Sequence, residues 1–460
     1  MSPTVVPASF RDPAGFVWAD GGAIYRHVGE SHREHYDAFI SSGLYDELVG
    51  DGSLVPHQET TVVESPRPGA YKVLKPEVVD FISYPYEWSF SQLKDAALLT
   101  LGIQKRSMER GLSLRDATAY NIQFQRGRPI LIDTLSFEVT PPGKPWIAYR
   151  QFCQHFLAPL ALMAYLDVRF GSLSRTYIDG VPLDLAAHLL PRRTRYNTGL
   201  LSNIHAQARV ERRHQKAGAP PKVKQREMSE QALKGIVWNL ERTVRKLEWS
   251  LPKTAWRDYY EEAGHYSEAA TDHKKELVGR FLDEAGGRSV WDLGGNVGVF
   301  SRIAADKGRT VVCFDIDPGC VEMNYRKVKQ DAETGVLPLL SDLRNPIPAL
   351  GWANRERAAF AERGPADVAM ALALIHHLAI GNNVPLDMVA EFFSELGSRL
   401  IIEFVPKSDP MVQTLLANRE DIFPNYDRAG FERAFGVYFE IERMEPVKDT
   451  DRVMYLLRRR

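Results

Sequence analysis

Short apolar runs alternate with helical stripes along the chain from Gly287 to the C-terminus. A short apolar run is typical of a buried strand, and apolar residues three and four apart are typical of a helix face. Strands are predicted over residues 289–293, 310–316, 336–342, 366–374, 399–405, 438–444 and 452–458. Helices are predicted over residues 300–307, 321–331, 388–396, 411–418 and 428–435. This βαβ alternation predicts a parallel sheet with helices on both faces, and the last two strands can pair as a hairpin.

The first half of the chain has less regular patterning. Apolar stripes predict helices over residues 91–110 and 229–250, and between them residues 191–226 are basic and carry the helix breakers Gly218, Pro220 and Pro221. A chain of 460 residues is too long for one core. We therefore predict three parts, namely an N-terminal α+β domain over 1–190, a basic linker with a bridging helix over 191–253, and an α/β domain over 254–460.

Composition and charge exclude several classes of protein. The 58 basic and 59 acidic residues give a net charge of -1, so no global positive field favours nucleic acid. The three cysteines form no CxxC pair, which argues against disulfides and a structural zinc site. There is no basic-then-apolar leader at the N-terminus and no apolar run long enough for a membrane helix. We expect a cytoplasmic protein without a metal site, and the sequence leaves the oligomeric state open.

A glycine-bearing turn follows the first predicted strand of the C-terminal half, in the segment Val290-Trp-Asp-Leu-Gly-Gly-Asn-Val-Gly298. An open parallel sheet binds nucleotides where such a turn joins a strand to a helix. Gly294 and Gly298 let the backbone approach a ligand closely, because neither has a Cβ atom. Taken alone, the segment is also compatible with an ordinary tight strand-to-helix turn.

Carboxylates end the next two predicted strands. Asp315 ends the second strand, where an acid can accept hydrogen bonds from both hydroxyls of a ribose. Asp317, on the same side of an extended chain, is a weaker alternative for this role. Asp342 ends the third strand, where an acid can accept from an adenine amino group. Each acid alone is compatible with a solvated loop, but together they indicate a nucleotide site.

These motifs resemble the class I methyltransferase superfamily, whose first motif reads roughly acidic-x-Gly-x-Gly-x-Gly. The resemblance covers the C-terminal part of the chain and implies a Rossmann-like seven-stranded sheet that binds S-adenosylmethionine. It implies a cradle for the methionine part and for the adenosine, made by Asp292, Gly294, Gly295, Asn296, Gly298, Asp315 and Asp342. Asn296 stands where the family has its middle glycine, a departure that a residue tolerant of left-handed backbone angles can accommodate.

Nicotinamide dehydrogenases also place an acid after their second strand. Their GxGxxG fingerprint requires glycines at positions where this chain has Asn296 and Val299. The sequence therefore favours S-adenosylmethionine over a nicotinamide cofactor.

Three residues are candidates for catalysis. His376 and His377 follow the fourth predicted strand, whose end faces the transferred methyl group in the resembled family, and a near-neutral histidine can take a proton from an attacking nucleophile. The alternative is that one or both are packed residues at a helix start. Glu403 ends the fifth strand, where it can orient substrate or simply pair with a base such as Lys407.

Two aromatic segments have both a functional and a structural interpretation. Trp256, Tyr259, Tyr260 and Tyr266 precede the first strand, where the resembled family often has a lid over the cofactor; otherwise they pack the linker helix. The segment 84–88, with two tyrosines and a tryptophan, either lines a substrate groove or is a buried extended segment.

In the N-terminal half, Asp116, Asn121 and Asp133 have the spacing of a kinase catalytic loop and its magnesium-binding acid. The resemblance implies a degenerate kinase-like domain, because no GxGxxG loop precedes it and neither Lys72 nor Lys75 lies in a convincing kinase context. A role in substrate recognition, an active kinase and chance similarity remain open.

The combined hypothesis is a methyltransferase that passes the methyl group of S-adenosylmethionine to an O or N nucleophile of a small-molecule acceptor. The alternatives are a bifunctional phosphotransferase and methyltransferase, with Asp116 as base and magnesium on Asn121 and Asp133, or a scaffold that has lost both activities.

Overall fold

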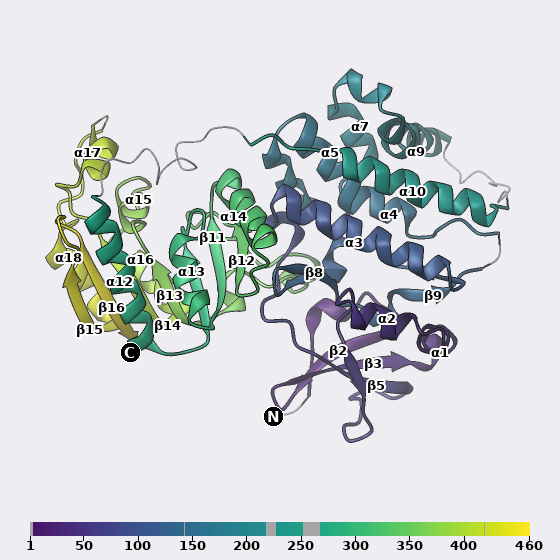
Figure 1. The fold of residues 1–460 in the computed structure, drawn as a ribbon, viewed down its shortest axis with the longest axis horizontal. Coiled ribbons are helices and arrows are strands. Elements are labelled where there is room, and N and C mark those ends of the chain that lie inside the picture. The colour runs from purple at the N-terminus through teal and green to yellow at the C-terminus, as the bar shows by residue number, and fades with distance from the viewer. Residues whose placement is uncertain (1–2, 142, 218–226, 252–266, 418) are drawn as a thin grey trace. The chain divides into compact units, whose positions relative to one another are not determined.

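The protein is described by a computed structural model over residues 3–141, 143–217, 227–251, 267–417 and 419–460. The chain forms two compact units. The N-terminal unit comprises Met1–Ser250 and Leu350–Arg357, and the C-terminal unit comprises Leu251–Ala349 and Ala358–Arg460. Both units combine helices with sheets (Figure 1), so the mixed α/β class predicted from the sequence is confirmed.

The N-terminal unit begins with a five-stranded antiparallel sheet in the order β1-β2-β3-β5-β4. Its strands are β1 (Thr4–Val5), β2 (Gly15–Asp20), β3 (Ala23–Gly29), β4 (His57–Glu59) and β5 (Ala70–Pro76). Helices α1 (Arg33–Ser41) and α2 (Leu44–Gly50) lie between β3 and β4 in the chain. Two further pairs of short strands follow, β6 (Leu112–Leu114) with β9 (Phe137–Val139) and β7 (Ile122–Gln125) with β8 (Arg128–Leu131).

A helical part completes this unit. The predicted helix over 91–110 is α3 (Phe90–Met108), which begins at a Ser89 capping box. The predicted bridging helix is α10 (Glu230–Lys246), capped by Ser229, and it packs against α3. Shorter helices between them are α4 (Tyr149–Phe152), α5 (Ala158–Tyr165), α6 (Leu173–Thr176), α7 (Leu183–Leu189), α8 (Thr198–Leu200) and α9 (Gln207–Ala217).

Residues 191–226 were predicted to form a basic loop, but much of this segment is helical in the structure. Residues 198–217 are helical, and residues 191–250 belong to the N-terminal unit rather than to a separate linker. The segment is rich in Arg, Gln and Ala, which favour helix, and its breakers Gly218, Pro220 and Pro221 come only after α9 ends. The breakers themselves lie outside the described residues.

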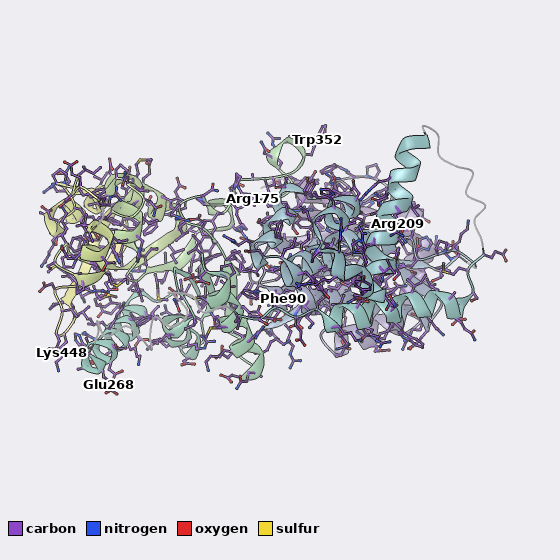
Figure 2. All side chains as sticks on the ribbon, turned by 90° about the horizontal axis from the view of Figure 1, so that it is seen from above. Phe90, Arg175, Arg209, Glu268, Trp352 and Lys448 are labelled. Carbon is purple, nitrogen blue, oxygen red and sulfur yellow. The ribbon has the colours of Figure 1, made fainter. Side chains whose placement is uncertain are left out.

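A loop from late in the sequence, Leu350–Arg357, packs within the N-terminal unit. The buried Glu356 carboxylate accepts two hydrogen bonds from the Arg11 guanidinium, at 3.0 and 2.9 Å. The Arg357 guanidinium lies 4.0 Å from the centre of the Tyr120 ring. Figure 2 shows Trp352 at the tip of this loop, where its side chain is exposed. The loop is therefore held by its charged residues rather than by its tryptophan.

The C-terminal unit contains a seven-stranded sheet in the order β12-β11-β10-β13-β14-β16-β15. The strands are β10 (Ser289–Leu293), β11 (Thr310–Asp315), β12 (Val336–Leu340), β13 (Ala366–Ala371), β14 (Gly397–Phe404), β15 (Phe439–Pro446) and β16 (Val453–Arg459). The first five are parallel to one another, and β16 is antiparallel to both β14 and β15. The order reverses at β10, so its carboxyl end is the switch point at which open sheets bind ligands.

Helices pack on the two faces of this sheet. One face is covered by α12 (Glu268–Ala285) and α13 (Val299–Asp306), whose apolar residues share one core with β10, β11, β13 and β14. On the other face, Phe431 of α18 (Arg428–Tyr438) packs against Phe404 and Tyr455, and α18 contacts α16 (Leu386–Leu396). The remaining helices are α14 (Pro318–Gln330), α15 (Ile375–Ala379) and α17 (Pro410–Leu416). Among the helices of the described ranges, none is both long and apolar enough to span a bilayer.

Candidate active site

The turn after β10 has the backbone geometry that its glycines predict. Gly294 and Gly298 have φ angles of +76° and +79°, and Asn296 also lies in the left-handed region at +54°. The amides of Gly294 and Gly295 both donate to the carbonyl of Phe314 in β11, at 2.8 and 3.0 Å. The turn is thus tied to the neighbouring strand, and Asn296 adopts the backbone conformation expected of the family's glycine.

Two glycines of this turn are enclosed by side chains. A Cβ atom on Gly295 would lie 2.5 Å from the Cys313 sulfur and 2.7 Å from a carboxylate oxygen of Asp292. A Cβ on Gly298 would lie 2.6 Å from the amide nitrogen of Asn324. A larger residue at Gly295 would displace these two side chains, and at Gly298 it would also be strained by the positive φ angle, so both positions favour glycine.

Asp292 lies at the carboxyl end of β10 and is almost fully buried. One carboxylate oxygen accepts a hydrogen bond of 2.6 Å from the Ser301 hydroxyl. Burial raises the pKa of Asp292 to about 6, because a charged carboxylate is poorly solvated there, although the Ser301 bond opposes this change.

Asp315 ends β11 and fixes the neighbouring backbone. Its two carboxylate oxygens accept hydrogen bonds from the amides of Asn296 and Asp317, both at 2.8 Å. Burial raises the pKa of Asp315 to about 6, and these backbone bonds partly offset the change. Asp317 instead accepts from the amides of Gly319 and Cys320 and caps α14. Both acids line the same cavity, so the preference for Asp315 as the ribose-binding acid stays a prediction.

Asp342 lies just beyond β12 and is engaged by a nearby arginine. The Arg344 guanidinium donates two hydrogen bonds to its carboxylate, at 2.8 and 3.0 Å. Burial alone would raise the pKa of Asp342, but these bonds outweigh burial and hold the pKa below its ordinary value. The preceding residue, Ser341, has a buried hydroxyl oxygen that contacts no hydrogen-bonding partner among the described residues.

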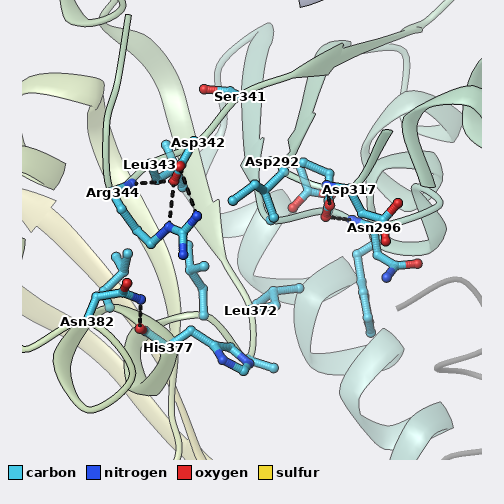
Figure 3. A pocket seen from close by; sticks show the side chains of 18 of the residues that line it. Asp292, Asn296, Asp317, Ser341, Asp342, Leu343, Arg344, Leu372, His377 and Asn382 are labelled. Atoms are coloured by element: carbon cyan, nitrogen blue, oxygen red, sulfur yellow. Dashed lines mark hydrogen bonds and ion pairs between the residues drawn. The ribbon is translucent and has the colours of Figure 1, made fainter. Parts of the chain in front are cut away.

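One cavity joins these groups (Figure 3). It has a volume of about 610 Å³, and its wall includes all the acids and the turn residues Gly294, Gly295 and Asn296. The other predicted turn residue, Gly298, is outside the wall and begins α13. Ser341 and Arg344 also line the cavity, and sequence reasoning missed both. The sequence indicates both residues only through their position next to Asp342, a predicted site residue.

The two adjacent histidines are placed differently. His377 lines the cavity, and burial followed by the nearby Arg452 lowers its pKa to about 4. His376 is buried, lies outside the cavity wall, and burial holds its pKa well below the ordinary value. Its Nδ1 atom makes no hydrogen bond to any residue that the structure describes. Both imidazoles are therefore neutral near pH 7, and only that of His377 faces the cavity.

Glu403 belongs to a buried group of charges. It is fully buried, and its carboxylate lies 2.6 Å from the Lys274 ammonium and 3.5 Å from the Arg452 guanidinium. The expectation that Glu403 pairs with a base is therefore confirmed, although Lys407, the base named for it, pairs instead with Asp421 at 2.7 Å. Glu403 is not part of the cavity wall, whereas its partner Lys274 is.

The predicted aromatic lid, with Trp256, Tyr259, Tyr260 and Tyr266, lies outside the described residues. The other aromatic segment is described. Tyr84, Tyr86 and Trp88 are all buried, which confirms the structural interpretation and excludes a groove lined by these side chains.

In the N-terminal unit, the three kinase-like residues lie close together, and two of them, Asn121 and Asp133, contact Ser136. Ser136 donates to the Asp133 carboxylate at 2.6 Å and accepts from the Asn121 amide at 3.2 Å. Asp116 accepts from the amide of Thr118 at 2.9 Å. Burial, followed by the charge of Asp133, raises the pKa of Asp116. The motif is thus one polar cluster.

An arginine side chain provides the positive charge in this cluster. The Arg26 guanidinium lies 2.5 Å from the Asp133 carboxylate and 3.1 Å from that of Asp12, which also pairs with Arg115. Lys72 pairs with Glu59 of β4 at 2.5 Å. Across the described ranges, no group of three or more acidic, histidine or cysteine residues could hold a metal ion.

We predict that magnesium and ATP leave the melting temperature of the protein unchanged, because Arg26 occupies the carboxylate that a magnesium ion would need. ATP at 100 times its Kd would stabilise the fold by about 2.7 kcal/mol, so differential scanning fluorimetry detects such binding. Stabilisation by magnesium and ATP that disappears in Asp133→Ala, but not in the exposed-site variant Asp167→Asn, would instead establish the phosphotransferase alternative.

Comparison with known proteins gives one relative over the whole chain. The nodulation protein NoeA of Rhizobium meliloti (strain 1021) is 33% identical over 462 residues, covering 99% of this chain and 96% of that protein. No protein-family model matches the chain.

The two solved structures described next align with less than half of this chain. The magnesium protoporphyrin IX methyltransferase ChlM from Synechocystis PCC 6803, with bound SAH, is 18% identical, with a TM-score of 0.30 over 44% of this chain and 98% of that chain. The bifunctional kinase-methyltransferase WbdD is 16% identical, with a TM-score of 0.31 over 47% of this chain and 45% of that chain.

Proposed function

The chain belongs to the family of the nodulation protein NoeA, and we propose that its C-terminal unit is a class I methyltransferase dependent on S-adenosylmethionine. The acceptor in this proposal is an oxygen or nitrogen nucleophile of a small molecule. The observation that carries it is the convergence of three strand-end acids, Asp292, Asp315 and Asp342, with the glycine-bearing turn around one cavity.

The residues of this cavity fit the cofactor. The Asp315 carboxylate lines the cavity and is oriented by hydrogen bonds from the backbone amides of Asn296 and Asp317. A carboxylate offers about four acceptor sites, so it can also accept from a ribose hydroxyl. At the end of β12, the Ser341 hydroxyl and the Asp342 carboxylate provide hydrogen-bonding groups for an adenine. The volume of about 610 Å³ is within the range of small-molecule sites.

S-adenosylmethionine supplies a methyl group that its sulfonium already activates, so the protein must mainly align the acceptor and remove a proton. His377 is the residue placed for the second task, since it lines the cavity and its neutral imidazole can accept a hydrogen bond from an O–H or N–H group. Glu403 serves as a positioning residue through Lys274.

The N-terminal unit, in this proposal, is a kinase-like domain that recognises the acceptor and transfers no phosphate. The support is its polar cluster, in which the Asp133 carboxylate is neutralised by Arg26. This assignment leaves the methyl-transfer chemistry entirely to the C-terminal unit.

We predict that binding of S-adenosylhomocysteine weakens as the pH falls through about 6. The pKa values of Asp292 and Asp315 are raised to about 6, so both carboxyls become protonated below that pH and lose the charged form that accepts from the ligand. Each group that loses its charge weakens binding by about 10-fold per pH unit below its pKa. Isothermal titration calorimetry between pH 5 and 8 measures this, and a constant Kd would contradict the assignment.

The stability of the empty protein has the opposite pH dependence. Unfolded aspartate loses its proton near pH 4, whereas Asp292 and Asp315 lose theirs near pH 6 in the folded protein. Between these pH values the folded state holds more protons, so these two groups make the fold less stable as the pH rises from about 4 to about 6.

The direct test of the activity uses S-adenosylmethionine carrying an isotope-labelled methyl group. The purified protein is incubated with this cofactor and fractions of a cell extract, and mass spectrometry identifies the molecule that gains the label. A labelled small molecule, absent when the Asp315→Asn variant is used, supports the proposal. Labelled protein or RNA instead would overturn the assignment of the acceptor.

A further inference from the structure

Five arginines lie on the surface of the helical part of the N-terminal unit. Three belong to a short 3-10 helix, Arg192–Tyr196, and two belong to α9, which Figure 1 shows beside α7. All five side chains are exposed to solvent. We call them the arginine patch, and its members are Arg192, Arg193, Arg195, Arg209 and Arg212.

A buried histidine connects the two parts of the patch. The Thr194 hydroxyl, in the middle of the 3-10 helix, lies 2.8 Å from Nε2 of His205, and both side chains are buried. Burial, followed by the charges of Arg195 and Arg209, lowers the pKa of His205, so both guanidinium groups lie near the same imidazole. The fold therefore holds the two parts together as one surface.

None of the five guanidinium groups forms an ion pair with an acid in the part of the chain that the structure describes. The guanidinium of Arg193 lies 5.7 Å from the centre of the Tyr165 ring. That of Arg212 donates a long hydrogen bond of 3.5 Å to the carbonyl of Asp184. Glu211, the acid between the two arginines of α9, pairs at 2.9 Å with an arginine outside the patch. The patch therefore keeps its positive charge for an external partner.

Exposed apolar side chains lie beside these arginines. Tyr196 ends the 3-10 helix and is 90% exposed, and Val210, between the two arginines of α9, is 44% exposed. Leu166, 42% exposed, follows Tyr165, whose ring contacts the patch. Single exposed apolar residues are ordinary in proteins, but three of them beside five unpaired arginines form a surface that is both cationic and apolar.

An anionic lipid bilayer matches both properties. Its phosphates attract clusters of about four to eight basic residues, and tyrosine and aliphatic side chains enter the boundary between headgroups and acyl chains. Nucleic acid matches less well. Its bases can stack on a tyrosine, but the aliphatic Val210 and Leu166 gain nothing from a sugar–phosphate backbone. The net charge of -1 also gives no wider positive field for a long polyanion.

We infer that the arginine patch binds the N-terminal unit to the anionic surface of a phospholipid bilayer, with Tyr196 entering the headgroup layer. The guanidinium groups pair with lipid phosphates, which their planar N–H donors contact in a bidentate manner. This binding is peripheral and needs no helix that crosses the bilayer. It uses none of the residues of the cavity at β10, so membrane binding and methyl transfer can fail separately.

Flotation of the full chain with lipid vesicles tests this inference. The vesicles contain phosphatidylcholine alone or with about one third of phosphatidylglycerol, whose headgroup is anionic. We expect binding to the anionic vesicles only, and weaker binding as the salt concentration rises from about 50 to about 300 mM. For Arg195→Gln/Arg209→Gln we expect about 25-fold weaker binding, since each arginine near the surface contributes a factor of about five.

A second variant tests the apolar part of the surface. Tyr196→Ser should weaken vesicle binding about fivefold, because the ring no longer enters the headgroup layer. The matched controls are Lys75→Gln/Arg128→Gln, which removes two exposed positive charges from β5 and β8, and Trp352→Ser, which removes another exposed ring. Both controls should bind anionic vesicles like wild type. All four variants alter exposed side chains, so their melting temperatures should equal that of wild type.

Each outcome decides the inference. Absence of binding to anionic vesicles, or an equal loss in Arg195→Gln/Arg209→Gln and in its charge-matched control, overturns it. Tighter binding of single-stranded RNA than of the vesicles would assign the patch to nucleic acid and likewise overturns it. A wild-type protein that floats with anionic vesicles through this patch, but does not bind S-adenosylhomocysteine, would support the inference and contradict the proposed function alone.

Discussion

Replacing Asp315 by Asn weakens the binding of S-adenosylhomocysteine by about 100-fold. In this proposal Asp315 accepts from the ribose while the amides of Asn296 and Asp317 hold its carboxylate, and the loss of hydrogen bonds to a charged group costs about 3 kcal/mol in total. The side-chain amide of this variant also has an NH₂ group in place of one carboxylate oxygen. This NH₂ group would face one of the two backbone N–H donors, so two donors would meet. Calorimetry gives the Kd, and 5′-methylthioadenosine, which retains the ribose, should lose affinity to the same extent.

Two controls accompany this variant. Asp331→Asn removes a carboxylate at the end of α14 that pairs with Lys327, and it should bind like wild type. Thermal unfolding of Asp315→Asn distinguishes a lost ligand contact from a disordered turn. A Kd within threefold of wild type would show that Asp315 does not contact the ligand.

The second large effect concerns stability. Glu403→Gln leaves the buried Lys274 without the carboxylate that lies 2.6 Å away, and breaking a buried pair in this way typically costs about 3–5 kcal/mol. We expect the lower part of this range, because burial already lowers the pKa of Lys274 and the ammonium can release its proton. For a unit of this size, about 3 kcal/mol lowers the melting temperature by roughly 6–12 °C.

Scanning calorimetry measures this change. The control is Glu440→Gln on the exposed strand β15, where the carboxylate pairs with Arg458 in solvent and contributes little. The double variant Lys274→Met/Glu403→Gln should recover part of the loss, because it leaves neither member of the pair alone. A melting temperature of Glu403→Gln equal to that of wild type would show that the buried charges do not interact as the distances imply.

Much of the C-terminal sheet was predictable because its central strands are buried on both faces. Such strands read as nearly continuous apolar runs, as in β10 and β11, and their ends are marked by polar residues. The positions of Asp292 and Asp315 followed from these ends. The left-handed conformation of Asn296 was also anticipated from the tolerance of asparagine for such angles.

Features that depend on contacts far apart in sequence were not predictable. Lys274 and Glu403 are 129 positions apart, and no local pattern indicates that they meet. The choice between His376 and His377 depends on the rotation of α15, because successive residues of a helix point about 100° apart. The pairing of Arg26 with Asp133 likewise joins a strand to a distant loop, so the sequence motif alone suggested a magnesium site.

The predicted loop over residues 191–226 was misjudged for a different reason. Its basic composition predicts a solvated loop, whereas residues 207–217 form α9. Arginine, glutamine and lysine favour helix when no glycine or proline interrupts them. Charge alone therefore does not distinguish a loop from a helix.

In the proposed function, the carboxyl ends of β10, β11 and β12 bind the cofactor, and hydrogen–deuterium exchange of the wild-type chain reports on these segments. With saturating S-adenosylhomocysteine, we expect at least about tenfold slower exchange at the amides of residues 293–298, 315–317 and 341–344, since ordering the turn suppresses local opening. Unchanged exchange in these three segments, with protection confined to other parts of the chain, would contradict it.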